Sequence, residues 1–336
     1  MRRPSRSPRL VSVCLAGTTA KSVSDNKRRI DLLTEVIETI TAHVAWYPID
    51  AVIFPGGLFR LDTPIGRKSF DERAKAIASR PFGSAAIKAA SALDEQMKGT
   101  LVVFGMFAES RGARERDDQA CVAVSSKGVV GLSRKIFPVD SDTDGRTYLV
   151  QSVADFSSAE RFVSLPNGST AVLSACYDLF GLAEDPEKPT VRTRAVRRLW
   201  NGKQLIQVGD EGFRALRAEC MVAWRQQLAE RKPGVAIATI HGFERSGRDG
   251  YWQRHGIAAA SAALAGGLVV GAANFTHGMP AADKSTLAAR RVPRSHLADA
   301  LHRPARALQP MDSLQLPAEG DTKVLLRLFT DLRGRP

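Results

Sequence analysis

Short apolar runs alternate with longer amphipathic stretches along most of the chain. Runs of roughly four to eight apolar residues are typical of buried strands, whereas apolar positions three and four apart are typical of helices. We predict strands at residues 9–16, 51–54, 101–104, 235–240, 268–273 and 322–329. We predict helices at residues 25–44 with Ser24 as N-cap, 71–98 with a break near Pro81, 191–200, 212–231 and 251–264. Strands that alternate with helices indicate an α/β fold.

Two pairs of apolar runs are separated by turn sequences and are predicted to be hairpins. The first pair is residues 120–124 and 129–133, and the second, 161–165 and 170–175, is joined through the turn signal Asn167-Gly168. The chain shows no internal repeat and no linker composition. We therefore expect a disordered basic tail at residues 1–8 and a single domain over 9–336. Within that domain, residues 279–306 are rich in Ala, Arg and Pro and are expected to form a surface excursion.

The chain is basic, with 48 Lys and Arg against 35 Asp and Glu and a formal net charge of +13. A nucleic-acid partner has to be considered for such a balance. The arginines are scattered, however, and no stretch interleaves basic and aromatic residues as a base-stacking platform would. We expect a solvated basic surface with weak, salt-sensitive attraction to polyanions and no specific nucleic-acid partner.

The cysteine spacing and the lengths of the apolar runs limit the possible cellular location and the possible metal or disulfide chemistry. The four cysteines are far apart and form no Cys-x-x-Cys pair, so neither a disulfide framework nor a zinc site is predicted. No His, Asp and Glu spacing indicates another metal, and no cofactor is expected. No apolar run approaches the roughly 18 residues of a membrane span. A reducing cytoplasm is the expected location.

Cys176 is the strongest candidate for chemistry. It follows the apolar run 171–175 and opens the segment Cys-Tyr-Asp-Leu-Phe-Gly. A cysteine at the end of a buried strand can present its sulfur in a cleft, where a thiolate nucleophile belongs in an α/β enzyme. The alternative is a buried cysteine that packs as a small hydrophobic residue.

Four segments, in this order, resemble the nitrilase or carbon–nitrogen hydrolase superfamily. They are Ala-Val-Ile-Phe-Pro at 51–55, Gly-Leu-Ser-Arg-Lys-Ile at 131–136, Ala-Cys-Tyr-Asp-Leu at 175–179, and Gly-Gly-Leu-Val-Val-Gly-Ala-Ala-Asn-Phe at 266–275. The resemblance spans about residues 9–330. It implies a four-layer α-β-β-α sandwich and a homodimer in which sheets stack across the interface.

The resemblance also implies a reaction and roles for two residues. Cys176 would be the nucleophile that forms a thioester with a small-molecule amide-type substrate, cleaving a carbon–nitrogen bond that is not a peptide bond. Lys135 would stabilise the negative charge of the tetrahedral intermediate, as an oxyanion hole does. By itself, Lys135 would be interpreted as a solvated basic residue at the end of a strand.

The chain departs from the family where a general base is required. Gly56, followed by Gly57, stands where the family places its base glutamate, and glycine cannot transfer a proton. Another carboxylate would then have to act as the base. Glu109, at the end of a predicted buried strand, is the first candidate, and Asp142 and Asp144 in the loop after Lys135 are the others.

Two other functions remain open. His241 and Glu244 follow the predicted strand 235–240, so a Cys-His-Glu glutaminase triad with Cys176 is conceivable; the flanks of Cys176 lack the glycines of a sharp nucleophile turn. His255 is expected to be structural. The second alternative is a catalytically impaired protein of the nitrilase type that is kept as a binding or regulatory subunit. The change at Gly56 favours this alternative, and the presence of Lys135 and Cys176 opposes it.

Overall fold

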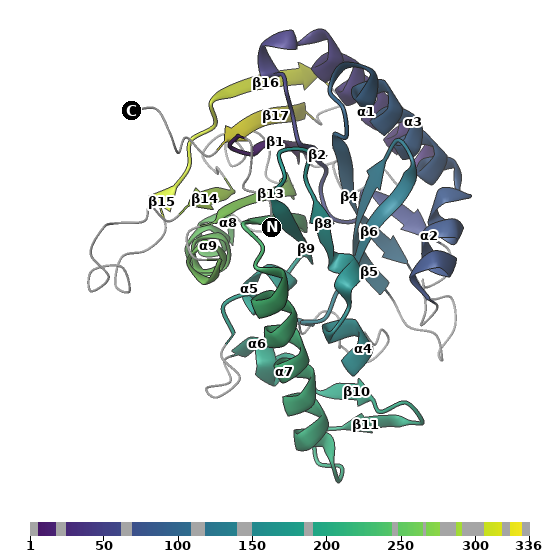
Figure 1. Ribbon diagram of the computed structural model, residues 1–336, viewed down its shortest axis with the longest axis vertical. Coiled ribbons are helices and arrows are strands. Elements are labelled where there is room, and N and C mark those ends of the chain that lie inside the picture. The colour runs from purple at the N-terminus through teal and green to yellow at the C-terminus, as the bar shows by residue number, and fades with distance from the viewer. Residues whose placement is uncertain are drawn as a thin grey trace.

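The computed structural model describes residues 6–17, 25–61, 69–108, 118–139, 150–184, 191–243, 248–264, 267–275, 287–290, 306–317 and 323–330. Within this part of the chain, fourteen strands form one large sheet, and three short strands form a second one. Helices lie on both sides of the large sheet (Figure 1).

The strands are β1 (Arg9–Ala16), β2 (Ala51–Ile53), β3 (Phe59–Leu61), β4 (Leu101–Ala108), β5 (Asp118–Ser125), β6 (Gly128–Arg134), β7 (Gln151–Ser152), β8 (Phe162–Ser164), β9 (Thr170–Ala175), β10 (Arg198–Trp200), β11 (Leu205–Gln207), β12 (Val235–Phe243), β13 (Leu268–Phe275), β14 (Ala288–Arg290), β15 (Arg306–Ala307), β16 (Asp312–Pro317) and β17 (Lys323–Thr330). The helices are α1 (Asn26–Ala42), α2 (Phe70–Ala78), α3 (Pro81–Gln96), α4 (Val153–Phe156), α5 (Asp178–Gly181), α6 (Val191–Ala195), α7 (Phe213–Arg231), α8 (Arg248–Tyr251) and α9 (Ala258–Ala263). A π-helical turn, Trp252–Ile257, joins the last two helices, and Val44–Trp46 and Ala159–Arg161 are 3₁₀ turns.

The large sheet folds over on itself, so that two halves stack face to face. Its central order is β6-β5-β4-β2-β1-β13-β12-β9-β8, and β5 and β4 of one half lie across from β9 and β12 of the other. Side chains of alternate residues fill the space between the halves, among them Ile53, Val103, Leu173 and Ile237. Because both faces of these strands are covered, their sequences are almost continuously apolar.

Helices cover the two outer faces. On one side, α1 and α3 pack residues such as Leu33, Ile37 and Leu93 against outward-facing strand residues. On the other side, α7, α9 and the π-helical turn contribute Trp224, Ala260 and other residues to a separate core. The order of layers is therefore helix, sheet, sheet, helix, and the prediction of a four-layer α-β-β-α sandwich is confirmed.

Strand directions bring several loops to one edge of the sandwich. β2 and β4 run parallel to β1, and β9 and β12 run parallel to β13, which is itself parallel to β1. β6 is antiparallel to β5, which is antiparallel to β4, so β6 points the same way as β4. The carboxyl ends of β2, β6, β9, β12 and β13 consequently lie along a common edge, called here the carboxyl edge.

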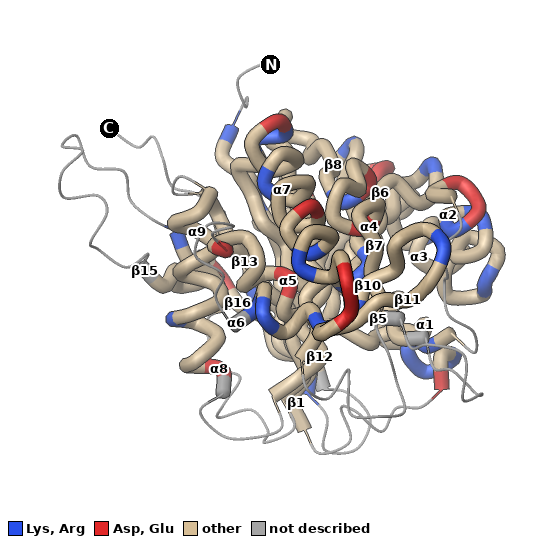
Figure 2. Tube along the Cα trace, turned by 90° about the horizontal axis from the view of Figure 1, so that it is seen from below, with Lys and Arg blue, Asp and Glu red and all other residues tan. Residues whose placement is uncertain are grey.

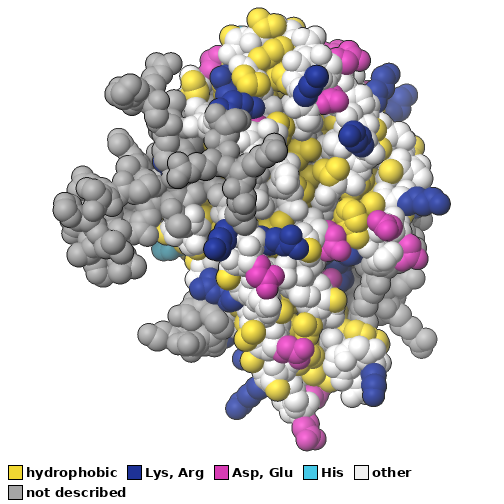
Figure 3. Space-filling model, in the orientation of Figure 1, with side chains coloured by type: hydrophobic (Ala, Val, Ile, Leu, Met, Phe, Trp, Pro, Cys, Tyr) yellow, Lys and Arg dark blue, Asp and Glu magenta, His cyan; other side chains and the backbone are white. Residues whose placement is uncertain are grey.

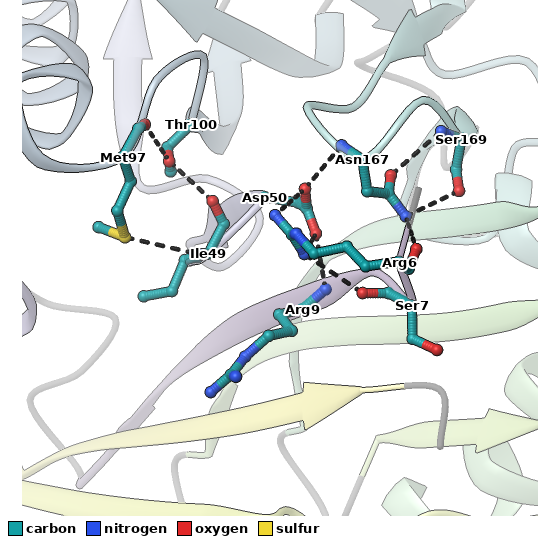
Figure 4. A network of polar contacts seen from close by, with 9 residues as sticks. All are labelled: Arg6, Ser7, Arg9, Ile49, Asp50, Met97, Thr100, Asn167 and Ser169. Atoms are coloured by element: carbon teal, nitrogen blue, oxygen red, sulfur yellow. Dashed lines mark hydrogen bonds and ion pairs between the residues drawn. The ribbon is translucent and has the colours of Figure 1, made fainter. Parts of the chain in front are cut away.

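A buried carboxylate ties the chain together at the opposite end of the strands, called here the amino edge (Figure 4). Asp50, which directly precedes β2, is fully buried and accepts two hydrogen bonds from the Arg6 guanidinium at 2.7 and 2.8 Å. It also accepts hydrogen bonds from the backbone N–H groups of Arg9, at 2.8 Å, and Asn167, at 3.0 Å. Of the predicted tail, Arg6 is thus fixed to the domain, and residues 1–5 lie outside the described residues.

Several predicted elements change in the structure. The helix predicted at 191–200 ends at Ala195, because Arg198–Trp200 pairs as β10 with β11 and β7, and this tertiary pairing overrides the local pattern. The N-cap of α1 is Asp25, whose side chain accepts a hydrogen bond from the N–H of Lys27; Ser24 lies outside the described residues. Both hairpins are confirmed as β5–β6 and β8–β9.

Charged side chains are spread over the surface without separation by sign. Figure 2 shows Lys and Arg interspersed with Asp and Glu along the trace, and Figure 3 shows the same mixture on one face. Over the residues that the structure describes, no helix is both long enough and apolar enough to cross a membrane.

Candidate functional site

Cys176 occupies a strained position at the carboxyl end of β9. Its backbone N–H donates to the carbonyl of Thr239 at 3.0 Å, which continues the β9–β12 ladder by one residue. Its φ is +53°, in the left-handed region that a residue with a β-carbon rarely adopts. Such a conformation costs of order 1–3 kcal/mol, and strained residues cluster at functional sites. The side chain is largely buried, at 9% exposure.

Lys135 follows β6 at the same edge. It is 1% exposed, and its Nζ donates to Oε1 of Gln119 at 2.9 Å. The Nζ also lies 6.0 Å from the ring centroid of Tyr177, the residue after Cys176. A buried lysine is uncommon, because burial takes its ammonium away from water. The expectation of a solvated lysine at a strand end is therefore wrong for this residue.

Asp178 joins the segment after Cys176 to the segment after Lys135. Its fully buried carboxylate accepts hydrogen bonds from the backbone N–H of Ile136, at 2.9 and 3.1 Å, and of Phe137, at 2.8 Å. Asp178, two residues after Cys176, is thus hydrogen-bonded directly to Ile136, the residue after Lys135. This contact fixes the relative position of the two loops that carry the candidate nucleophile and cation.

The Asp178 carboxyl lies in a buried pair with Arg161, whose Nη1 is 3.9 Å from Oδ2. Burial raises the pKa of Asp178 to about 6, although Arg161, the two backbone N–H groups and Lys135 all favour the ionised form. Burial also lowers the pKa of Arg161. The guanidinium is held by Oγ of Ser133 at 3.0 Å and by the carbonyl of Asp155 at 2.7 Å. The pair is a structural support for the two loops.

Aromatic side chains form a wall next to Cys176. Tyr177 stacks on Phe180 with centroids 5.1 Å apart, and Trp252 contacts both rings. The guanidinium of Arg192 lies 4.6 Å from the Tyr177 centroid, within cation–π distance. Trp252 begins the π-helical turn, and such turns occur frequently at functional sites. Phe180 and Trp252 are buried members of the helix-covered core.

Gly56 is in close contact with β12. Its N–H donates to the carbonyl of Ile240 at 2.9 Å, and a β-carbon at this position would lie 2.7 Å from the backbone nitrogen of His241. Asn274 Nδ2 donates to the carbonyls of both Gly56, at 3.2 Å, and His241, at 2.6 Å. No side chain fits at position 56 unless β12 moves.

The space over Gly57 is filled by an imidazole ring. Gly57 has φ +65°, and a β-carbon there would lie 2.6 Å from Cε1 of His241. The ring also contacts Phe107 edge to face, with centroids 5.5 Å apart. His241, which the sequence offered only as part of an alternative triad, therefore lies against the Gly56-Gly57 turn after β2.

The other predicted site residues divide into two groups. Glu109, Asp142, Asp144 and Glu244 lie outside the described residues, so their positions stay predictions. His255 is exposed on the π-helical turn, where its ring contacts Tyr251. Among the described residues, no cluster of His, Cys, Asp and Glu could hold a metal ion.

Two contributors were not found from the sequence. Gln119, the hydrogen-bond partner of Lys135, lies 16 residues before it, and no local pattern marks it. Asp178 stands inside the Cys-Tyr-Asp segment, which was the available signal, but its backbone partners could not be deduced from spacing.

Searches for related proteins give similarities in structure only. No known family and no curated protein matches the chain. An amidase from Nesterenkonia sp. is 12% identical, with a TM-score of 0.44, over 98% of this chain and 92% of that one. A mutant of the Nesterenkonia AN1 amidase "from the nitrilase superfamily" is 14% identical, with a TM-score of 0.42, over 81% and 78%. A carbon–nitrogen hydrolase from Helicobacter pylori G27 is 11% identical, with a TM-score of 0.42, over 81% and 75%. Identities and scores this low do not carry a function over to this chain.

Proposed function

We propose that the chain is a carbon–nitrogen hydrolase that cleaves a small-molecule amide through a thioester on Cys176, with Lys135 as the oxyanion-stabilising cation. One observation carries the proposal: the Asp178 carboxylate accepts hydrogen bonds from the backbone N–H groups of Ile136 and Phe137. It joins the loop of a strained, buried cysteine to the loop of a buried ammonium. A structural core has no need of both groups at a strand edge.

The proposed reaction uses the thiolate and the ammonium in sequence. The Cys176 thiolate attacks the carbonyl carbon, and the carbonyl oxygen takes the negative charge. The Lys135 ammonium donates a hydrogen bond to that oxygen in a site with little water, where such donors contribute most. The C–N bond then breaks, the amine leaves with a proton, and water hydrolyses the thioester to a carboxylate and free thiol.

A second function has one specific observation in its favour. The backbone contact between Gly56 and His241 leaves no room for a carboxylate at position 56. A binding or regulatory protein needs no catalytic base, so it would tolerate the loss of a carboxylate there. Such a protein would bind an amide or its acid without turnover. The buried lysine and strained cysteine favour the enzyme, because a binding site has no use for a nucleophile.

Turnover of small amides tests the proposed function. The purified chain is incubated with a panel of aliphatic and aromatic primary amides, and released ammonia is measured. Turnover by the wild type that is lost in Cys176→Ala and kept in Cys220→Ala supports the proposal. Cys220 is the matched control, because it is also a buried cysteine in the same helix-covered core. Turnover that survives Cys176→Ala, or binding of amides with no turnover at all, would overturn it.

A further inference from the structure

The turn after β2 is built around the side chain of His241. Gly56 and Gly57 leave open the volume that their side chains would occupy, and the His241 backbone and ring fill it, with contacts of 2.6 to 2.7 Å to the positions of the absent β-carbons. Gly105, in β4, lies equally close, since a β-carbon there would be 2.3 Å from the Cα of Gly56. Gly56 thus lies between Gly105 of β4 and the His241 backbone of β12, and only Gly57 faces the imidazole ring.

The position of the ring is fixed from several sides. Asn274 holds the His241 carbonyl, and Phe107 lies against the ring. Below the turn, the buried Arg29 of α1 donates Nη1 to the carbonyl of Gly57 at 2.6 Å and also to that of Leu58. Helix α1, β4 and β13 therefore all contribute to the placement of one half-buried imidazole at the carboxyl edge.

Strand register makes His241 a near neighbour of Cys176. Ala175 pairs with Thr239, so Cys176 lies opposite Ile240, one residue before His241. The two residues therefore lie near each other at the carboxyl edge, where the register of β12 with β13 shifts between Ile240 and Phe243. The positive φ of Cys176 sets it apart from the extended residues of β9 before it, and its side chain packs with Ile240 in the helix-covered core. For a proton to pass between them, the thiol and the imidazole must meet at this edge directly or through one water.

The other ionisable groups described around Cys176 and His241 are less suited to accept the thiol proton. Lys135, Arg29 and Arg192 are cations with hydrogen atoms to donate. Asp178 is occupied by the backbone N–H groups of residues 136 and 137 and by Arg161. An imidazole changes its protonation near neutral pH and so can both take and return a proton there.

We infer that His241 is the acid–base residue of this site, in the place of a carboxylate after β2. This inference rests on the function proposed above. His241 takes the proton of the Cys176 thiol, and the thiolate forms the C–S bond as the carbonyl electrons move to oxygen. The imidazolium then gives its proton to the nitrogen as the C–N bond breaks. In the second half, His241 takes a proton from the attacking water and returns it to the cysteine sulfur.

The rate of Cys176 alkylation by iodoacetamide as a function of pH tests the inference without a substrate. In the wild type, the rate rises with an inflection between roughly pH 6 and 7, where imidazoles titrate. In His241→Asn, the inflection moves to about 8.5, the value of a free thiol, and the rate at pH 7 falls at least tenfold. His43→Asn is the matched control: it changes another partly exposed histidine, which contacts Trp46 near Asp312, and leaves the profile unchanged.

A second measurement does not require a stable His241 variant. Nuclear magnetic resonance titration of the histidine rings compares the wild type with Cys176→Ala. We expect the titration of one imidazole, assigned to His241, to shift when the thiol is removed, while the other rings are unaffected. Identical titrations in the two proteins would overturn the inference, as would an alkylation profile unchanged in His241→Asn.

Turnover separates this inference from the proposed function. Loss of a general base lowers kcat about 10²–10⁴-fold, so amide hydrolysis in His241→Asn should fall by that factor. If hydrolysis needs Cys176 but is indifferent to His241, the function stands and the inference fails. If no amide is hydrolysed but Cys176 and His241 titrate together, the paired site stands and the proposed reaction fails.

Discussion

At the amino edge of the sandwich, the buried Asp50 carboxylate is fully paired, whereas the carboxyl edge keeps unfavourable features. Asp50 receives four hydrogen bonds from Arg6, Arg9 and Asn167. The carboxyl edge instead has a cysteine with φ +53°, a buried lysine, and a carboxyl, Asp178, whose pKa is raised to about 6. One edge of the sandwich is thus stabilised by a hydrogen-bonded carboxylate, and the other holds a strained residue and buried charges. This distribution is expected when the second edge is an active site.

The largest expected effect is on catalysis, from Lys135→Gln at the carboxyl edge. Removal of one donor to an oxyanion lowers kcat about 10²–10³-fold. Because glutamine keeps a polar group beside Gln119, the fold should persist. Steady-state kinetics on an amide turned over by the wild type provides the measurement. A variant with wild-type kcat would show that the ammonium has no part in the reaction.

The second expected effect is on stability, from Asp50→Asn at the amino edge. Removing one partner of a buried ion pair costs about 3–5 kcal/mol, and the partial exposure of Arg6 places this case at about 3 kcal/mol. Urea unfolding gives the free energy of unfolding, and iodoacetamide labelling of Cys176 should be unchanged in the folded variant. Altered labelling would mean that the two edges are coupled.

The third prediction concerns the contact of Gly56 with β12. In Gly56→Ala, the new methyl group meets the backbone of His241, and overpacking of this kind costs about 1–3 kcal/mol. Gly234→Ala is the control, because nothing lies within 4 Å of a β-carbon there and its φ is not positive. Thermal unfolding of both variants measures the difference. Equal stabilities would contradict the close approach on which the placement of His241 depends.

The fourth expected effect is the pH dependence that Asp178 contributes. Its pKa is about 6 in the folded protein against an ordinary value of 3.8, mainly because of burial, so the folded state binds the proton more tightly. Stability should therefore fall as pH rises from about 4 to 6, by at most about 1.4 kcal/mol per unit. Urea unfolding across this range should show that fall in the wild type relative to Asp178→Asn. Parallel curves would contradict the raised pKa.

Sequence patterns predicted most of the scaffold because the strands are buried on both faces and the helices have one apolar face. The strand predicted at residues 9–16 is β1 (Arg9–Ala16). Strand β16, by contrast, was missed, since Leu314 and Leu316 alternate with polar residues over a short stretch beside a proline. The strand conformation of β16 depends on its antiparallel pairing with β17, and the local sequence preference alone does not specify it.

The candidate site was predictable only in part. Cys176 and Lys135 could be proposed from strand ends and a family resemblance, and parallel strands bring such ends together. The close contact at Gly56 involves His241, which is 185 positions later in the chain. The Asp50 network joins residues up to 161 apart. Contacts of that range leave no periodic trace in the sequence.

Competitive labelling of the four cysteines tests the central claim most directly, namely that the carboxyl edge activates Cys176. The native protein is treated with iodoacetamide at pH 7, and peptide mass spectrometry gives the rate at each cysteine. We predict that Cys176 reacts at least tenfold faster than free cysteine. Cys14, Cys121 and Cys220 should stay unlabelled, because they are buried and burial raises the pKa of each thiol, to about 12 for Cys121 and Cys220. A Cys176 that reacts no faster than free cysteine, or no faster than the other three, would contradict the claim.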